Sequence, residues 1–214
     1  LWFSLYSVTE FSSFPRLDPA AFTGPAAVVR NRGYIFNRSD SQTRLLNRRG
    51  LEDALQVSMA HARRHDLPTS AIMVDIDHFK QVNDSFSHEI GDHVIRQVAE
   101  VISRLCRSSD VVARTGGEEF LVVLPDTELN SARVLAERIR EAIGERPLLV
   151  DFQRIAVTVS LGVASSNGLV DLDHLTQEAD RALYLAKRGG RNRVASVESR
   201  RVHLSTANGP GSAS

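Results

Sequence analysis

The order of the hydrophobic segments in the middle of the chain constrains the fold most strongly. The segments are predicted as strand, helix, strand, strand, helix and strand, over residues 71–75, 90–105, 111–113, 120–124, 134–143 and 155–164. This is the order of the ferredoxin-like βαββαβ motif. The sequence therefore predicts an α+β domain, in which further helices over residues 50–65 and 175–186 flank the motif.

The topology of this motif brings acidic residues together. A right-handed crossover makes the first two strands parallel, and the third strand lies between them, antiparallel to both. The C-terminal end of the first strand and the tip of the hairpin then lie at the same edge of the sheet. Four carboxylates are expected at this edge: Asp75, Asp77, Glu118 and Glu119.

Converging carboxylates repel one another unless cations lie between them. Rigidly held carboxylate oxygens suit Mg²⁺, and two such ions are a general device for in-line phosphoryl transfer. Gly116 and Gly117 lack a Cβ, which allows a tight turn and the close approach of a bulky ligand. The alternative is that the two glycines only make the hairpin turn and that the acids are solvated.

Composition excludes several other classes of function. The 26 basic and 26 acidic residues of the 214-residue chain cancel, which argues against a domain that wraps a nucleic-acid polymer. The single cysteine, Cys106, excludes an internal disulfide and a multi-cysteine zinc site. No apolar stretch approaches the roughly 20 residues that a membrane-spanning helix needs.

The two ends of the chain lack a sustained hydrophobic period. Residues 1–39 are rich in Pro, Ser, Ala and Gly, so we expect a linker or a truncated upstream segment there. Residues 40–198 are expected to form the folded domain, and residues 199–214 a disordered tail. We expect a cytoplasmic domain controlled by an upstream sensory domain or partner, in a full-length protein that a membrane could tether.

Several short motifs resemble, in order, those of the diguanylate cyclase (GGDEF domain) family. The signature match is Gly116-Gly117-Glu118-Glu119-Phe120, the GGEEF form. The other motifs cover residues 40–49, 75–84, 160–164 and 179–187, followed by 190–192. The resemblance implies the palm fold of nucleotidyl cyclases. Two positions depart from the family pattern: Gln42 replaces an apolar residue, and Ser87 replaces a glycine.

The resemblance implies an enzyme that joins two GTP molecules into cyclic di-GMP and releases two pyrophosphates. Asp75 and Glu118 would bind two divalent ions per site, Mg²⁺ or Mn²⁺, with the backbone carbonyl of Ile76 as a further ligand. Glu119 would act as a third acid or help to deprotonate the attacking 3′-hydroxyl. Each domain would hold one GTP, so a homodimer would be needed for catalysis.

The same resemblance assigns residues that would hold GTP. Asn83 and Asp92 would read the guanine edge, the backbone N–H groups of His78 and Phe79 would cradle phosphate, and Lys80, Lys187 and Arg191 would neutralise the triphosphate. The resemblance also implies that Lys80 is one of the catalytic residues. A carboxylate at Asp92 can accept from guanine N1–H and N2–H₂, a pair that adenine lacks, which disfavours an adenine-containing product. The alternatives are an ordinary charged helix start at Asp92 and a solvated basic helix end at Lys187.

Arg107 and Asp110 resemble the family's inhibitory product site, an Arg-x-x-Asp that ends six residues before Gly116. Arg107 could donate two hydrogen bonds to a phosphate or to a guanine edge, and Asp110 could accept one from a guanine N–H. An ordinary surface ion pair is the alternative. The rival function is a non-catalytic cyclic di-GMP receptor that acts through this site, against which the intact Glu118 and Glu119 argue.

Overall fold

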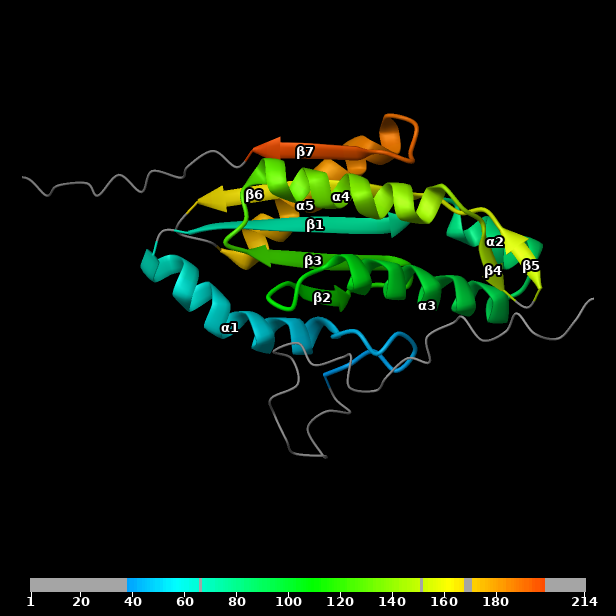
Figure 1. Ribbon diagram of the computed structural model, residues 1–214, viewed down its shortest axis with the longest axis horizontal. Helices are drawn as coiled ribbons and strands as arrows, with labels where there is room; N and C mark the ends of the chain where they lie inside the picture. Colours follow the sequence, from blue (N-terminus) through cyan, green and yellow to red (C-terminus); the bar gives the residue numbers. More distant parts are fainter. Residues whose placement is uncertain (1–37, 66, 151, 168–170, 199–214) are drawn as a thin grey trace, which may run out of the picture.

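The computed structural model describes residues 38–65, 67–150, 152–167 and 171–198, which form a central sheet with helices packed around it (Figure 1). The helices are α1 (Arg48–His65), α2 (Phe79–Ser85), α3 (His88–Leu105), α4 (Leu129–Gly144) and α5 (Leu172–Arg188). The strands are β1 (Pro68–Ile76), β2 (Val111–Arg114), β3 (Glu119–Pro125), β4 (Leu148–Val150), β5 (Gln153–Ile155), β6 (Val159–Asn167) and β7 (Val194–Glu198). The predicted tail, and the predicted linker up to residue 37, lie outside the described residues.

Five of the strands form one sheet, in the order β2-β3-β1-β6-β7. Strand β3 is antiparallel to both β1 and β2 and lies between them, so the predicted βαββαβ topology is confirmed. Strand β6 pairs with the other side of β1, also antiparallel. The end of β1 therefore lies beside the start of β3, as predicted.

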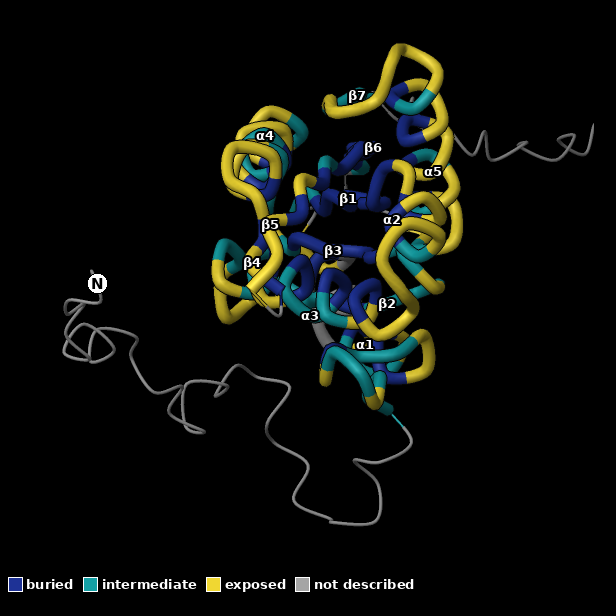
Figure 2. Tube along the Cα trace, turned by 90° about the vertical axis from the view of Figure 1, so that its right-hand side faces the viewer, coloured by how far each residue is buried: buried dark blue, intermediate teal, exposed yellow. Residues whose placement is uncertain are grey.

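Alternation along β1 assigns its side chains to two separate hydrophobic cores. Ile72, Val74 and Ile76 pack in a core with α3 and α4, whereas Ala71 and Met73 pack in a core with α1 and α5. Figure 2 shows this arrangement, with α3 and α4 on one side of the buried sheet and α5 on the other. Because successive side chains of a strand point to opposite faces, Asp75 belongs to the α5 face.

The N-terminus of α3 is fixed by Ser87, one of the two departures from the family pattern. The Ser87 hydroxyl accepts a hydrogen bond from the Ile90 amide at 3.3 Å, which satisfies one of the free N–H groups of the first turn. Helix α3 begins at His88, two residues before the predicted start at residue 90, so Asp92 lies inside its first turns. Serine thus replaces glycine here with a capping function of its own.

Four elements were not predicted: α2, β4, β5 and β7. Helix α2 has only seven residues, and only Phe79 and Val82 are buried, which is too short a run to show a helical period. Strands β4 and β5 form a separate hairpin with three residues in each strand, and β7 gains its place by pairing in parallel with β6. The β-rich segment 155–164 is divided between the end of β5 and β6. None of the helices in the described ranges is long and apolar enough to cross a membrane.

Candidate active site

The end of β1 and the start of β3 carry an acidic edge, which consists of Asp75, Glu118 and Glu119. Asp75 lies opposite Glu119 in the register of β1 and β3. The Asp75 side chain is buried on the α5 face, where the Lys187 ammonium donates to its Oδ2 at 2.8 Å. The alternation of side chains along β1 therefore explains why the Asp75 carboxylate contacts a basic residue of α5.

Negative charge is concentrated at the acidic edge. Burial raises the pKa of Asp75 above its usual value, even though the Lys187 hydrogen bond and charge oppose the rise. Burial also raises the pKa of Glu118, and the neighbouring charges of Asp75 and Glu119 add to that effect. The ionised forms of these carboxylates are thus destabilised, and a bound cation would relieve the destabilisation.

The donor atoms at this edge fit a hard divalent cation. The Ile76 amide donates to the Glu118 carbonyl at 3.3 Å, so the backbone at Ile76 lies beside Glu118. In the described ranges no three His, Cys, Asp or Glu side chains form a metal-binding group. Mg²⁺ is commonly held by only one or two carboxylates, with water and substrate phosphates completing its shell. The residues present therefore fit a cation that a phosphate-bearing substrate shares.

Gly116 and Gly117 serve the acidic edge for two different reasons. A Cβ on Gly116 would stand 2.5 Å from Glu119 Oε2, so glycine lets the Glu119 carboxylate lie against the turn. A Cβ on Gly117 would meet nothing within 4 Å, so that position is open on its outer side. The first glycine accommodates a catalytic candidate, and the second leaves space beside it.

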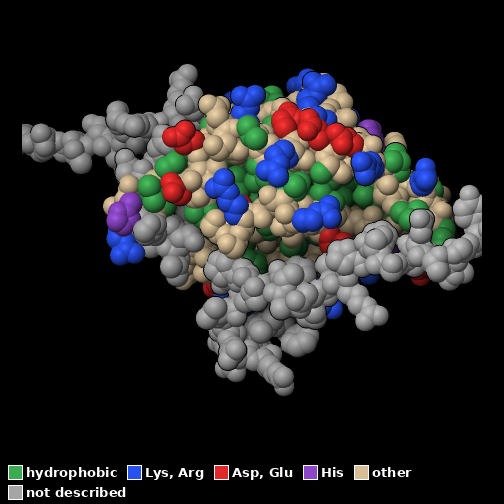
Figure 3. Space-filling view, in the orientation of Figure 1, with side chains coloured by type: hydrophobic (Ala, Val, Ile, Leu, Met, Phe, Trp, Pro, Cys, Tyr) green, Lys and Arg blue, Asp and Glu red, His purple; other side chains and the backbone are tan. Residues whose placement is uncertain are grey.

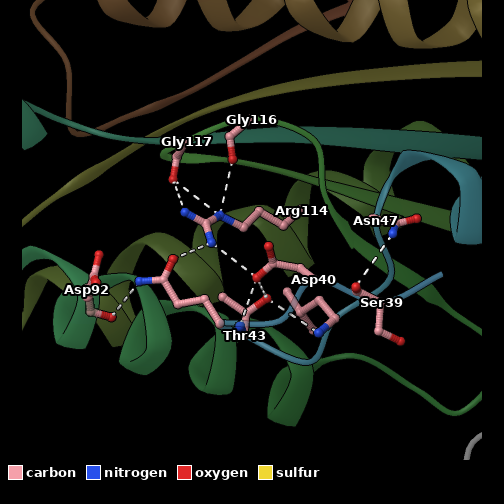
Figure 4. Close-up of polar contacts among 10 residues, drawn as sticks. Ser39, Asp40, Thr43, Asn47, Asp92, Arg114, Gly116 and Gly117 are labelled. Atoms are coloured by element: carbon pink, nitrogen blue, oxygen red, sulfur yellow. Dashed lines mark hydrogen bonds and ion pairs between the residues drawn. The ribbon is translucent and has the colours of Figure 1, made fainter. Parts of the chain in front are cut away.

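Arg114 fastens the turn to the start of the domain (Figure 4). Its Nε donates to the Gly116 carbonyl at 3.1 Å, its Nη2 donates to the Gly117 carbonyl at 2.6 Å, and its Nη1 pairs with Asp40 Oδ1 at 3.1 Å. Burial alone would raise the pKa of Asp40, but hydrogen bonds from Thr43 and the Arg114 charge outweigh it and lower that pKa. Sequence reasoning missed Arg114, although its place just before the signature was visible.

Gln42, the second departure from the family pattern, joins this network. Its Oε1 accepts from Arg114 Nη1 at 2.5 Å, and its Nε2 donates to the Asp92 carbonyl at 3.4 Å. Figure 4 shows the chain of contacts from the glycine turn through Arg114 to the backbone of Asp92. An amide at position 42 therefore links the turn to α3, which an apolar side chain could not do.

Asn83 and Asp92 are brought together by a close approach of α2 to α3. A Cβ on Gly91 would collide with Asn83 Oδ1, so glycine lets the asparagine side chain lie directly against α3. Asn83 Oδ1 is buried, and no hydrogen-bond partner reaches it in the described structure. The Asp92 side chain, one residue along α3, is exposed. An unsatisfied acceptor and an exposed carboxylate thus flank the same helix contact.

The segment that follows β1 turns sharply into α2. His78 caps α2 in the left-handed region, with φ 56° and ψ 28°, an uncommon conformation for a non-glycine residue. Phe79 is buried in the first turn of α2, and Lys80 next to it is exposed. The backbone amides of His78 and Phe79 therefore lie at a helix start next to the acidic edge.

Lys187 and Arg191 approach the acidic edge from different structures. The spacing of four residues would place them on one helix face if both were helical, but α5 ends at Arg188. Arg191 lies in the following loop with φ 60°. Its charge lowers the pKa of Asp75, although less than the Lys187 charge does.

Asp77 was predicted to join the converging carboxylates, but its carboxylate is engaged elsewhere. It accepts hydrogen bonds from Thr158 Oγ1 at 2.7 Å, Ser160 Oγ at 2.6 Å and the Asn192 amide at 3.0 Å. Only 5% of the residue is exposed. The acidic edge therefore has three members, and Asp77 serves a different purpose.

A second site lies at the opposite end of β3, about 20 Å from the turn by strand length. A pocket of about 240 Å³ is lined there by Leu105, Arg107, Asp110, Leu124, Thr127, Ser131, Val134, Leu135 and Arg138. Figure 3 looks onto the α3 and α4 side of the molecule, where basic and acidic side chains surround exposed hydrophobic ones.

The predicted pair Arg107 and Asp110 is brought together at this pocket through a backbone turn. Asp110 Oδ2 accepts the Arg107 amide at 2.6 Å, and burial raises the pKa of Asp110. The ion pairs of the described residues do not include one between these two side chains, although the Arg107 charge acts to lower the pKa of Asp110. Arg138 of α4 adds a second guanidinium, which sequence reasoning missed because α4 follows much later in the chain.

Comparisons with known proteins place the chain in a family. The model of the family described as "Diguanylate cyclase, GGDEF domain" matches residues 37–193. The domain has the palm architecture of nucleotidyl cyclases, as the resemblance implied. The chain therefore belongs to the GGDEF domain family of diguanylate cyclases.

Named relatives and solved structures agree with this assignment. The chain is 43% identical over 156 residues to the diguanylate cyclase DosC of Escherichia coli (strain K12), over 72% of this chain and 34% of DosC. It is 41% identical over 159 residues to the response regulator PleD of Caulobacter vibrioides, over 73% of this chain and 35% of PleD. The chain thus spans about a third of the length of these relatives.

Two solved structures resemble the fold closely. The coiled coil and GGDEF domain of DgcB from Caulobacter crescentus, in complex with c-di-GMP, gives a TM-score of 0.73 at 34% identity, covering 78% of this chain and 88% of that one. The active GGEEF domain of a diguanylate cyclase from Vibrio cholerae gives a TM-score of 0.65 at 37% identity, covering 71% and 97%.

Proposed function

We propose that the chain is a diguanylate cyclase, which condenses two GTP molecules into cyclic di-GMP and releases two pyrophosphates. The observation that carries this proposal is the acidic edge, where Asp75, Glu118 and Glu119 gather beside the Lys187 ammonium. A receptor would not need the charges of Asp75 and Glu119 beside Glu118, where they raise its pKa. An active site that binds cations and a polyphosphate would use all of these acidic side chains.

Asp75, Glu118 and the backbone carbonyl of Ile76 would hold the divalent ions, Mg²⁺ or Mn²⁺, two per site. When bound, these ions would neutralise developing charge on the α-phosphate and favour ionisation of the attacking hydroxyl. The raised pKa values of Asp75 and Glu118 support this role, because burial disfavours the ionised carboxylates and a bound cation would offset that cost.

Asn83 and Asp92 would bind the guanine base. The buried, unpartnered Oδ1 of Asn83 can accept an N–H from the base, and an unmade bond at such an atom is costly. The exposed carboxylate of Asp92 can accept from N1–H and N2–H₂ of guanine. Adenine offers no such pair of donors, so these residues favour GTP over ATP.

Backbone amides and basic side chains would hold the triphosphate. The backbone amides of His78 and Phe79 lie at the sharp turn into α2, where successive amides can cradle phosphate oxygens as a nest does. Lys80 and Arg191 are exposed beside the acidic edge, and Lys187 reaches into it. Lys187 and Arg191 supply positive charge next to Asp75, where the phosphates would meet the cations.

Each domain holds one GTP, so two domains must face each other for reaction. The 3′-hydroxyl of one GTP attacks the α-phosphorus of the other, a P–O bond forms, and the bond from that phosphorus to pyrophosphate breaks. Glu119, held against the turn at Gly116, would accept the hydroxyl proton directly or through water. A second, equivalent step closes the ring. The protein contributes mainly positioning and charge stabilisation.

The test is product formation as a function of protein concentration. With GTP and Mg²⁺, the activity per milligram should rise with protein concentration until all of the protein is dimeric. A monomer binds only one of the two GTP molecules that must react. Mass spectrometry should identify cyclic di-GMP, and ATP should give no cyclic dinucleotide. If no cyclic di-GMP forms at any concentration, but added cyclic di-GMP binds tightly, the receptor function is correct instead.

We further propose that the pocket containing Arg107, Asp110 and Arg138 binds cyclic di-GMP as a feedback inhibitor. Two guanidinium groups can pair with phosphates or guanine edges, and the Asp110 carboxylate can accept from a guanine N–H. The pocket lies at the far end of β3 from the acidic edge, so product and substrate would bind separately.

Replacing Arg138 by alanine should weaken cyclic di-GMP binding by about tenfold, because a charge-assisted hydrogen bond to the ligand is lost. Isothermal titration calorimetry measures this directly. Arg133→Ala is the matched control, since Arg133 is an exposed arginine of the same helix that does not line the pocket. Equal affinity of the Arg138 and Arg133 variants would show that the product does not bind here.

A further inference from the structure

The loop of residues 189–193, which carries Arg191, has an unusual backbone. Three successive residues have positive φ values: Gly190 at 111°, Arg191 at 60° and Asn192 at 45°. Glycine adopts this region freely, but arginine and asparagine do so only when their surroundings hold them there. The loop must therefore be fixed by contacts outside itself.

Hydrogen bonds of the loop backbone lead to three different parts of the domain. The Arg191 amide donates to the Ala186 carbonyl at 3.1 Å, which ties the loop to the end of α5. The Leu161 amide donates to the Arg193 carbonyl at 2.9 Å, which ties it to β6. Between these two, the Asn192 amide donates to the Asp77 carboxylate at 3.0 Å. Asp77 is the one side chain among these three backbone anchors, and Arg140 Nη1 separately donates to the side-chain Oδ1 of Asn192 at 3.2 Å.

The Asp77 carboxylate is itself held rigidly. Both oxygens are used, since Ser160 Oγ donates to Oδ1 at 2.6 Å and Thr158 Oγ1 donates to Oδ2 at 2.7 Å. The Asp77 amide also donates to the Thr158 carbonyl at 2.9 Å. A nearly fully buried carboxylate with three donors makes stronger bonds than a neutral acceptor would.

We propose that Asp77 is a positioning residue that locks the 189–193 loop against the sheet, so that Arg191 is held ready to bind the nucleotide's β- and γ-phosphates. This inference rests on the proposed function. The two acids at the end of β1 then have complementary roles, since Asp75 contacts the side chain of Lys187 and Asp77 contacts the backbone of the loop that carries Arg191. Each places one cation of the phosphate-binding side.

The test compares the affinities of a fluorescent GTP analogue and of GMP for the full chain. Asp77→Ala removes the anchor and should weaken binding of the GTP analogue by about tenfold, as Arg191→Ala should. GMP lacks the phosphates that Arg191 reaches, so its affinity should change less than about twofold. In the double variant the two losses should not add, because Asp77 acts through Arg191.

Asp77→Asn keeps the side-chain volume and leaves a neutral oxygen for the Asn192 amide. It should weaken binding of the GTP analogue by about threefold, again without affecting GMP. If circular dichroism shows that Asp77→Ala does not fold, this variant still tests the proposal. Equal losses for the GTP analogue and GMP, or additive losses in the double variant, would overturn the positioning function. If the unmodified chain binds neither ligand, the proposed function fails instead.

Discussion

Replacing Glu118 by glutamine should lower the rate of cyclic di-GMP formation by at least about a thousandfold. Glutamine keeps the size of the side chain but removes a charge from the acidic edge, where Asp75 and Glu119 are its neighbours. The loss should appear in kcat and should persist at high protein concentration, because the proposed role of Glu118 is in the reaction and not in dimer formation. Steady-state kinetics with GTP and Mg²⁺ measure it, and Glu145→Gln, at an exposed position beyond α4, is the control.

The same variant should be at least as stable as the unmodified chain in metal-free buffer. The pKa of Glu118 is raised by burial and by neighbouring negative charge, so its ionised form is disfavoured in the folded state at neutral pH. Removing that charge relieves the repulsion, and the thermal midpoint should stay equal or rise. A near-normal rate for Glu118→Gln would contradict a catalytic function of Glu118. A lower thermal midpoint would contradict the repulsion between Glu118 and the other carboxylates of the acidic edge.

Replacing Gly162 by alanine should destabilise the domain by about 3 kcal/mol or more. Gly162 lies in β6 on the face covered by α5, where a Cβ would collide with the Ala179 carbonyl oxygen and the Leu183 amide nitrogen. These atoms belong to the backbone of α5 and cannot rotate away. The helix would have to move off the sheet, and Lys187, near its end, would leave Asp75.

Thermal denaturation followed by circular dichroism should show a loss of about 10 °C for Gly162→Ala. Gly144→Ala is the matched control, because a Cβ there meets its nearest neighbours at 3.7 and 3.9 Å, which is ordinary contact. Its midpoint should change by less than about 2 °C. A midpoint for Gly162→Ala near that of the control would mean that α5 does not pack on β6 as described.

The order of β2, β3, β1 and β6 was predictable, because it depends on hydrophobic segments and on the handedness of crossovers. Asp75 and Glu119 could be placed together for the same reason, since each lies at the end of a strongly apolar strand. Helix α2 could not be predicted, because its burial depends on Phe79 and Val82 alone. The fold of the middle of the chain therefore follows from local pattern and topology.

The partners of individual side chains could not be predicted in this way. Asp77 resembled a fourth member of the acidic cluster in sequence, but its three donors come from residues 158, 160 and 192, which only the folded chain brings near it. Arg138 joins Arg107 because α4 packs on α3, a contact that no local motif encodes. The roles of Gln42 and Ser87 depend on hydrogen bonds with Arg114 and with the Ile90 amide, which form only in the folded chain.

The ion pair between Lys187 and Asp75 has a consequence for the order of binding events. In the free protein, the Lys187 ammonium stabilises the charge of the buried carboxylate. A divalent cation on Asp75 would replace the ammonium in that role and release it for a phosphate oxygen. The cation and the polyphosphate would then each increase the affinity for the other, with reciprocal coupling free energies. Nucleotide should accordingly enter most readily as its metal complex.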